Sequence, residues 1–218
     1  MIDYAQARLN MVDSQLRTNK VTDPRVLEAF LAVPRERFVP AGLRGTAYVD
    51  DDLPLGGGRY LLAPMTEARL LQLAAIGPDE AVLEIGCATG YGTAVIARLA
   101  RSVVAIESDP ALAEQAAARL RELAVGNATV IAAPLEEGYP GLGPYGAVVF
   151  QGGVARLPDA FAPQLAEGGR LVAVMPKAVG MGQAVIMTRF GSLLSRRPSF
   201  DAAAPPLPGF QREPSFVF

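Results

Sequence analysis

The sequence predicts an α/β protein built on a mostly parallel, doubly wound sheet. From residue 81 onward, short apolar runs typical of strands alternate with amphipathic segments typical of helices, a pattern that favours parallel strands joined by helical crossovers. The first 40 residues instead repeat apolar side chains at helical spacing. Near the C-terminus, apolar runs flank Gly191-Ser192, which is typical of an antiparallel hairpin and unlike an all-parallel sheet.

The N-terminal region is predicted to be helical at first and then irregular. Apolar residues recur at helical spacing in 11–16 and again in 26–31. Between these runs, Asp23-Pro24 is typical of a helix start, with Asp as the N-cap and Pro at the first helical position. Residues 41–63 contain an acidic run and three successive glycines, so we expect a loop there.

The rest of the chain is predicted to alternate helix and strand. The pair Asp109-Pro110 repeats the helix-start signal, and Gly168-Gly169 is typical of a helix end. The expected helices cover 66–75, 91–100, 109–123 and 158–166, the expected strands cover 81–85, 103–106, 129–132, 147–150 and 170–175, and the hairpin strands cover 184–190 and 193–196.

Composition narrows the possible chemistry. The 218-residue chain has a formal net charge of −2, so no strong attraction to nucleic acid or to an anionic membrane is expected. It contains no histidine, which excludes a histidine general base, a Ser-His-Asp triad and a histidine-ligated metal. The single cysteine, Cys87, cannot form an intrachain disulfide or a cysteine zinc cluster, and no metal site is expected.

The chain is expected to be soluble and cytoplasmic. It contains no run of 18 apolar residues. The first ten residues include Asp3 and lack the apolar core of a secretory signal. The sequence leaves the oligomeric state open.

The segment richest in chemistry is a strand that runs into a glycine-rich turn and then a helix, VLEIGCATGYG at 82–92. Gly86 and Gly90 permit a tight turn and a close approach of the backbone to a ligand. In an open α/β sheet such a turn lies beyond the carboxyl ends of the strands, where ligands bind. We therefore expect a ligand site at this turn.

The residues around this turn favour an adenosyl ligand without a pyrophosphate. The glycine spacing differs from the G-x-G-x-x-G of dinucleotide-binding proteins, and Glu84 would repel a pyrophosphate. Glu107 ends the next strand, 21 residues after Gly86, where an acid accepts hydrogen bonds from ribose hydroxyls. This combination predicts S-adenosylmethionine. The alternative is a purely structural turn followed by a surface glutamate, and Cys87 is most simply a small turn residue.

Motifs spread over most of the chain resemble those of protein-L-isoaspartate O-methyltransferases in order and spacing. They are MVDSQLR at 11–17, VPRERFVP at 33–40, LPL at 53–55, VLEIGCATGY at 82–91 and GGRLV at 168–172. The resemblance implies a Rossmann-like S-adenosylmethionine methyltransferase fold with seven strands, the antiparallel hairpin last and a helical N-terminal extension. It also implies one compact unit, in which residues 1–63 form the extension and substrate loop and residues 64–218 bind the cofactor.

The resemblance further implies a cofactor site and a carboxylate acceptor from a peptide or protein. The expected cofactor-binding residues are Glu84, Gly86, Cys87, Ala88, Thr89, Gly90, Tyr91, Glu107, Ser108, Pro134 and Leu135. The expected product is S-adenosylhomocysteine. A carboxylate acceptor is already ionised at neutral pH, so this reaction needs no histidine.

Three stretches depart from the family pattern. Ala132-Ala133-Pro134 replaces a Gly-Asp-Gly whose acid lies near the adenine, so Glu136, Glu137 or backbone carbonyls are the candidate partners of the adenine amino group. The small-residue run after the fourth strand begins with Gln151. The third departure is the substrate loop.

The substrate loop of the family reads Gly-x-Thr-Ile-Ser before a proline, whereas this chain has GRYLLAP at 58–64. Leu62 stands at the Ser position and has no hydroxyl for the isoaspartyl carboxylate, and Tyr60 stands at the Thr position. Arg59 and Tyr60 are the candidates to anchor an acid instead. The sequence thus predicts a carboxyl methyltransferase whose activity on isoaspartyl peptides is weak or shifted.

Two other functions fit parts of the sequence. A non-catalytic protein that binds S-adenosylmethionine or adenosylhomocysteine would keep the adenosyl site and lose the substrate loop, and Leu62 favours it. A dinucleotide-dependent oxidoreductase is the third alternative, which the glycine spacing and Glu84 disfavour.

Overall fold

The computed structural model describes residues 2–177 and 179–211 of the chain. The α-helices are α1 (Tyr4–Met11), α2 (Pro24–Ala32), α3 (Pro64–Ala74), α4 (Tyr91–Ile96) and α5 (Pro110–Glu122). The strands are β1 (Leu53–Gly56), β2 (Arg59–Leu61), β3 (Ala81–Ile85), β4 (Ser102–Glu107), β5 (Ala128–Ala132), β6 (Tyr145–Gly153), β7 (Leu165–Met175), β8 (Gln183–Phe190) and β9 (Leu193–Asp201). Short helical turns are η1 (Val12–Leu16), η2 (Arg17–Asn19), η3 (Arg35–Arg37), η4 (Ala41–Thr46), η5 (Leu135–Glu137), η6 (Pro140–Leu142) and η7 (Asp159–Gln164).

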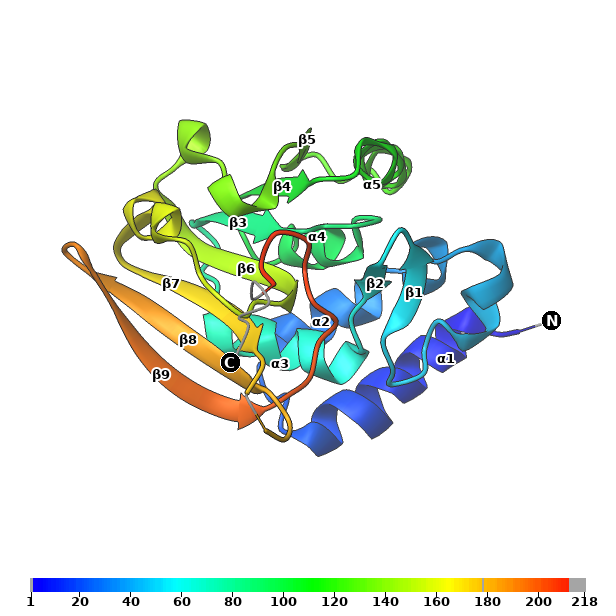
Figure 1. Cartoon of the computed structure of the whole chain (residues 1–218). Coiled ribbons are helices and arrows are strands. Elements are labelled where there is room, and N and C mark those ends of the chain that lie inside the picture. Colours follow the sequence, from blue (N-terminus) through cyan, green and yellow to red (C-terminus); the bar gives the residue numbers. More distant parts are fainter. Residues whose placement is uncertain (1, 178, 212–218) are drawn as a thin grey trace, which may run out of the picture.

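Seven strands form the central sheet, in the order β5-β4-β3-β6-β7-β8-β9 (Figure 1). Strands β3 to β7 are parallel, whereas β8 runs antiparallel to β7 and β9 antiparallel to β8. Phe190 pairs with Leu193 across Gly191-Ser192. The predicted mostly parallel sheet and its C-terminal hairpin are therefore confirmed.

The two Asp-Pro pairs begin helices as predicted. The carboxylate of Asp23 accepts a hydrogen bond from the backbone amide of Arg25 at the start of α2. The carboxylate of Asp109 accepts from the amides of Ala111 and Leu112 at the start of α5. Each proline occupies a first-turn position whose missing N–H leaves no helical bond unmade.

Alternating side chains of the central strands enter two separate hydrophobic clusters. Along β3, Val82 packs with residues of α2, α3 and α4 on one face of the sheet. The next residue, Leu83, packs on the other face with Phe161 of η7 and with Phe210 of the C-terminal segment. Full α-helices thus cover one face, and short helical turns together with the C-terminal segment cover the other.

Two predicted helices are shorter in the structure than expected. The helix expected over 158–166 was wrong in type and length, because η7 is a 3-10 turn and β7 already begins at Leu165. Pro163 lies inside that segment, and a proline removes the amide that would extend an α-helix. The helix expected over 91–100 ends as α4 at Ile96. Within the described residues, no helix has both the length and the apolar character required to cross a bilayer.

Two segments outside the central sheet reach its carboxyl edge. Strands β1 and β2 form a separate two-stranded sheet between η4 and α3. After β9, the chain runs back over the end of β6, where the amide of Gly153 donates to the carbonyl of Pro205 and Leu207 donates back to Gly153 (Figure 1, red). Both segments meet at the glycine-rich turn after β3.

Candidate functional site

The glycine-rich turn after β3 is fixed by its own backbone. The amides of Gly86 and Cys87 both donate to the carbonyl of Ile106 on β4, at 2.9 and 3.1 Å, and the amide of Gly90 donates to Cys87. Gly86 and Gly90 have φ angles of 79° and 89°, which favour glycine. Between them, Ala88 also has a positive φ angle, 47°, which is uncommon for a residue other than glycine.

Glu107, at the end of β4, is the acceptor at the centre of a hydrogen-bond network. Its buried carboxylate accepts from the amide of Ala88 at 2.7 Å, from the amide of Ser108 at 2.9 Å and from the amide of Asp109 at 3.2 Å. The Ser108 hydroxyl also donates to it, at 3.3 Å. The structure therefore brings together Ala88, Glu107 and Ser108, three of the predicted cofactor-binding residues.

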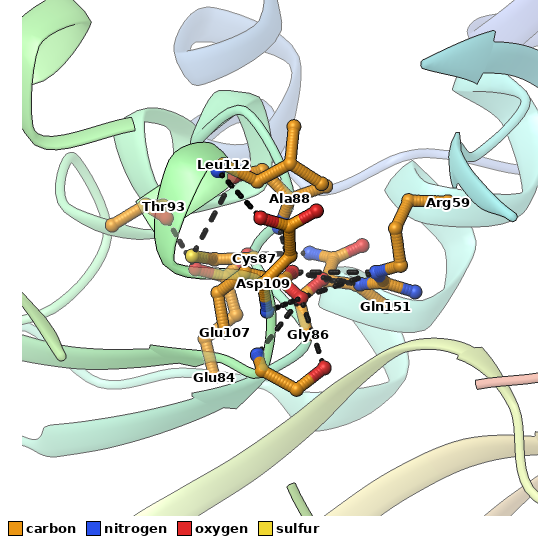
Figure 2. Close-up of polar contacts among 11 residues, drawn as sticks. Arg59, Glu84, Gly86, Cys87, Ala88, Thr93, Glu107, Asp109, Leu112 and Gln151 are labelled. Carbon is orange, nitrogen blue, oxygen red and sulfur yellow. Dashed lines mark hydrogen bonds and ion pairs between the residues drawn. The ribbon is translucent and has the colours of Figure 1, made fainter. Parts of the chain in front are cut away.

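Arg59 of β2 completes this network (Figure 2). Its Nε atom lies 3.3 Å from each carboxylate oxygen of Glu107, and its Nη2 atom lies 3.0 Å from Oε2 and 2.7 Å from the carbonyl of Gly86. Arg59 is only 3% exposed. The sequence predicted that Arg59 anchors an acidic acceptor, whereas in the structure Arg59 pairs with Glu107, a predicted cofactor-binding residue.

A second buried acid, Glu84, lies within the protein interior. Its carboxyl contacts the hydroxyl of Thr93 and accepts a hydrogen bond from the side-chain amide of Gln151 at 2.8 Å. Burial raises the pKa of Glu84 to about 8. Burial thus favours the neutral form of Glu84, which weakens the repulsion of a pyrophosphate that the sequence predicted.

Glu67 of α3 extends the same cluster toward the N-terminal region. Its carboxylate lies 3.4 Å from the amide nitrogen of Gln151 and 3.5 Å from the guanidinium of Arg35. Burial raises the pKa of Glu67 to about 7, against the lowering effect of Arg35. Because Arg35 is fully buried and permanently charged, we assign the negative charge of this cluster to Glu67 and the proton to Glu84.

Arg35 holds the substrate loop over 58–64 in place by a hydrogen bond to its backbone. Its guanidinium donates to the carbonyl of Leu62 at 2.6 Å and to that of Ala47 at 2.8 Å, and it stacks 4.8 Å from the ring centre of Tyr91. The Leu62 side chain is 1% exposed and lies in the main hydrophobic cluster. Tyr60 is half-buried on β2. Leu62 therefore acts as a packing residue, and Tyr91 lies beneath the loop rather than at a surface.

The remaining turn residues are also buried. The hydroxyl of Thr89 donates to the carbonyl of Phe38, which ties the turn to the N-terminal extension. Burial raises the pKa of the Cys87 thiol, so this group stays protonated at neutral pH and is a poor nucleophile.

Beside Glu107 the surface is hollowed by about 490 Å³. The hollow is lined by Ser108, Pro110, Ala132, Ala133, Pro134, Glu136, Pro208 and Gly209. Predicted residues Ser108 and Pro134 thus face one space, whereas Leu135 next to them is fully buried in the second cluster. A partly apolar hollow next to the acid that is predicted to bind a ribose suits an adenine ring.

Leu207 is a site residue that sequence reasoning missed. It is fully buried, and a Cβ atom on Gly86 would lie 2.7 Å from its Cδ2 atom and 2.6 Å from Nη2 of Arg59. The only signal in the sequence is an apolar residue between prolines in a segment expected to be a loop. Glu67 gave no signal, because it lies among apolar residues of a predicted helix.

The geometry fits an adenosyl cofactor. It provides a glycine-rich turn, an acid that accepts hydrogen bonds at the end of β4, and a hollow beside that acid. A sequence profile described as "Protein-L-isoaspartate(D-aspartate) O-methyltransferase (PCMT)" matches residues 7–189. The chain belongs to this family.

Curated relatives support the assignment over most of their length. The chain is 41% identical over 169 residues to "Protein-L-isoaspartate O-methyltransferase 1" of Rhodopseudomonas palustris, covering 78% of this chain and 69% of the relative. It is 42% identical over 170 residues to "Protein-L-isoaspartate O-methyltransferase" of Herpetosiphon aurantiacus, covering 78% and 76%.

Solved structures support the fold. A protein-L-isoaspartate O-methyltransferase structure superposes with a TM-score of 0.76 at 25% identity, covering 90% of this chain and 65% of that one. A Plasmodium falciparum protein, described as a putative member of the family in complex with S-adenosyl-L-homocysteine, superposes with a TM-score of 0.77 at 17% identity and covers 94% and 97%. The predicted Rossmann-like methyltransferase fold is confirmed.

Proposed function

We propose that this chain is an S-adenosylmethionine-dependent carboxyl methyltransferase that acts on isoaspartyl residues of peptides or proteins. The observation that carries the proposal is the set of hydrogen-bond donors around the carboxylate of Glu107. In this family member, Glu107 lies at the strand end where an open α/β sheet binds a ribose. The relatives named above are enzymes of this type, so neither the non-catalytic protein nor the oxidoreductase is favoured.

The proposed site has a cofactor side and an acceptor side. On the cofactor side, Glu107 accepts hydrogen bonds from the ribose hydroxyls, and the hollow beside Ser108 and Pro134 takes the adenine. When bound, S-adenosylmethionine supplies a methyl group activated by a sulfonium charge. The acceptor carboxylate is already ionised, so the protein needs to orient it and exclude water rather than remove a proton.

The apolar side chains near the turn serve that exclusion of water. Leu207 covers Gly86, and Leu62 fills the space beneath the substrate loop. The absence of a hydroxyl at Leu62 removes one hydrogen-bond donor for the acceptor carboxylate. We therefore propose that turnover of isoaspartyl peptides is slower than in a family member with the Gly-x-Thr-Ile-Ser loop.

A methyl-transfer assay tests this function directly. The protein is incubated with methyl-labelled S-adenosylmethionine and an isoaspartyl peptide, with the same peptide containing ordinary aspartate as the matched control. We expect base-labile methyl ester on the isoaspartyl peptide only. Calorimetry with adenosylhomocysteine and with NAD provides the second arm, in which binding of NAD alone would support the oxidoreductase.

The outcomes separate the competing functions. Binding of adenosylhomocysteine without any methyl transfer to peptide or protein carboxylates would support the non-catalytic alternative. Equal transfer to the two peptides would contradict isoaspartyl selectivity and leave a general carboxyl methyltransferase.

A further inference from the structure

Arg59 lies where the ribose of the proposed cofactor is expected. Its guanidinium contacts both oxygens of Glu107 and the carbonyl of Gly86, and it would collide with a Cβ atom on Gly86 (Figure 2). Gly86 is the position at which the sequence predicted close approach of a ligand to the backbone. In this structure that approach is made by a side chain of the protein itself.

Donors surround the carboxylate of Glu107, and Arg59 covers both of its oxygens. Oε1 accepts from the Ser108 amide and hydroxyl, from the Asp109 amide and from Arg59, and Oε2 accepts from the Ala88 amide and from Arg59. A ribose hydroxyl that approaches these oxygens from the side of Arg59 must therefore displace the guanidinium.

Displacement of Arg59 requires movement of only a small element. Arg59 is the first residue of β2, and β1 and β2 form a two-stranded sheet separate from the central one. An isolated hairpin of this size is marginally stable by itself. Gly57 and Gly58 form its exposed turn immediately before Arg59, and these two glycines and Gly56 at the end of β1 all have positive φ angles.

A guanidinium released from Glu107 would stay close to the substrate loop, because Arg59 is part of that loop. Arg59 precedes Leu62 by three residues, and Leu62 supplies no hydroxyl for a carboxylate. Removal of a buried arginine from its acid is costly unless another anion replaces that acid. A planar guanidinium pairs a carboxylate through two hydrogen bonds, so an acidic acceptor is a suitable replacement.

We propose that Arg59 links the two substrates of the reaction by competing with the cofactor for Glu107. Cofactor binding displaces Arg59, and the released guanidinium then binds the acceptor carboxylate, so the cofactor binds first. This inference rests on the proposed function and assigns Arg59 as the substrate-positioning residue of the same site.

The competition between Arg59 and the cofactor is tested by the direction in which cofactor affinity changes. Arg59→Gln removes the competing cation, while four other donors still bind Glu107. Calorimetry should therefore show that the Kd of this variant for adenosylhomocysteine is lower than that of the wild type by about ten-fold or more. Arg59→Lys, which keeps one charge without the guanidinium fork, is expected to lie between the wild type and Arg59→Gln. Arg37→Gln, which breaks the exposed ion pair with Glu122, is the matched control and should leave Kd unchanged.

Equal or weaker binding by both Arg59 variants would overturn the competition. Arg59→Lys also guards against loss of folding in Arg59→Gln, and thermal unfolding of each variant confirms that a folded protein was titrated. An Arg that merely supports the structure would weaken binding when removed, so the expected increase in affinity distinguishes the two roles.

Acceptor binding tests the second half of the proposal. At saturating cofactor, Arg59→Gln is expected to raise KM for an isoaspartyl peptide about ten-fold or more, with a smaller change in kcat. Peptide binding to the wild type, measured by fluorescence anisotropy, should require adenosylhomocysteine. An unchanged KM, or peptide binding that is equal with and without adenosylhomocysteine, would overturn the link.

The failure of this inference can be told from failure of the proposed function. If the wild type binds no adenosylhomocysteine, the proposed function fails and the inference with it. If the wild type binds adenosylhomocysteine and methylates the peptide, while Arg59→Gln and Arg59→Lys bind the cofactor no more tightly, only the role of Arg59 is rejected.

Discussion

The glycine-rich turn after β3 and the loop over 58–64, which contains Arg59, meet at Glu107 and differ in how they are built. The turn is held by backbone hydrogen bonds and by the carboxylate of Glu107, and its sequence follows the family pattern. The loop is held through the carbonyl of Leu62 by Arg35, and its side chains depart from that pattern. Because backbone contacts fix its path, such a loop can exchange its side chains and alter the acceptor without losing its position.

The largest expected effect comes from the turn side of this comparison. Glu107→Ala removes the acid that pairs a buried arginine, so we expect the free energy of unfolding to fall by about 3–5 kcal/mol. The variant should also bind adenosylhomocysteine weakly, because hydrogen bonds to a charged acceptor are lost. Urea denaturation and calorimetry measure the two effects.

Glu107→Gln is the control for shape. It keeps the volume and one acceptor oxygen, so it should be less destabilising than Glu107→Ala. Adenosylhomocysteine affinity equal to wild type in both variants would remove Glu107 from the site.

The second effect concerns the buried acid beneath the turn. Burial raises the pKa of Glu84 from 4.5 to about 8, so between these values the folded state binds more protons than the unfolded state. Its contribution to stability is fully present below about pH 4.5 and is lost as pH rises through about 8. We expect the free energy of unfolding to fall with pH in this window, by up to about 1.4 kcal/mol per unit for one carboxyl.

Glu84→Gln should flatten that slope. A glutamine stays neutral at every pH and retains a donor and an acceptor for Thr93 and Gln151. Denaturation at pH 5, 6, 7 and 8 for both proteins checks it. A wild-type stability that rises from pH 5 to 8, or an unchanged slope in the variant, would contradict the protonation of Glu84.

The third effect belongs to the acceptor loop. Leu62→Ser restores the hydroxyl of the family pattern, and one hydrogen bond to a charged acceptor corresponds to about ten-fold in kcat/KM for an isoaspartyl peptide. Leu62 is 1% exposed, so the same change leaves a cavity and lowers stability by about 2–5 kcal/mol. Kinetics must therefore be measured well below the unfolding temperature.

Leu62→Ala separates these two consequences. It creates a similar cavity without a hydroxyl and should lower stability without raising activity. A gain of activity in Leu62→Ala, or none in Leu62→Ser, would show that the loop does not limit isoaspartyl turnover. A marked loss of adenosylhomocysteine affinity in either variant would show that the loop and the turn are not independent.

The turn side was largely predictable, because its signals are local. The apolar strand over 81–85, the glycines after it and Glu107 at the next strand end are read from short stretches of sequence, and the fold places them together by topology alone. The Asp-Pro pairs likewise defined two helix starts. The assignment of these residues to the cofactor remains a prediction.

The contacts that span the two sides could not be predicted. Arg59 meets Glu107 across 48 positions of sequence, and Gln151 meets Glu84 across 67, so no periodicity or local motif reports either pair. Leu207 reaches Gly86 from a proline-rich segment that local signals identify only as a loop. Tertiary packing, rather than propensity, decides each of these positions.

The smallest expected effect concerns the adenine side, where the family acid is absent. Glu136 lines the hollow beside Ser108 but is exposed, and a hydrogen bond from an adenine amino group to an exposed carboxylate competes with water. Glu136→Gln should therefore change the Kd for adenosylhomocysteine by about two-fold or less, within the range of surface substitutions.

Glu137→Gln is the matched control, since Glu137 is also exposed and is not among the residues that line the hollow. A ten-fold loss in Glu136→Gln alone would identify Glu136 as the adenine partner that replaces the family acid. Equal, small effects in both variants would leave backbone carbonyls near Pro134 as the candidate partner of the adenine amino group.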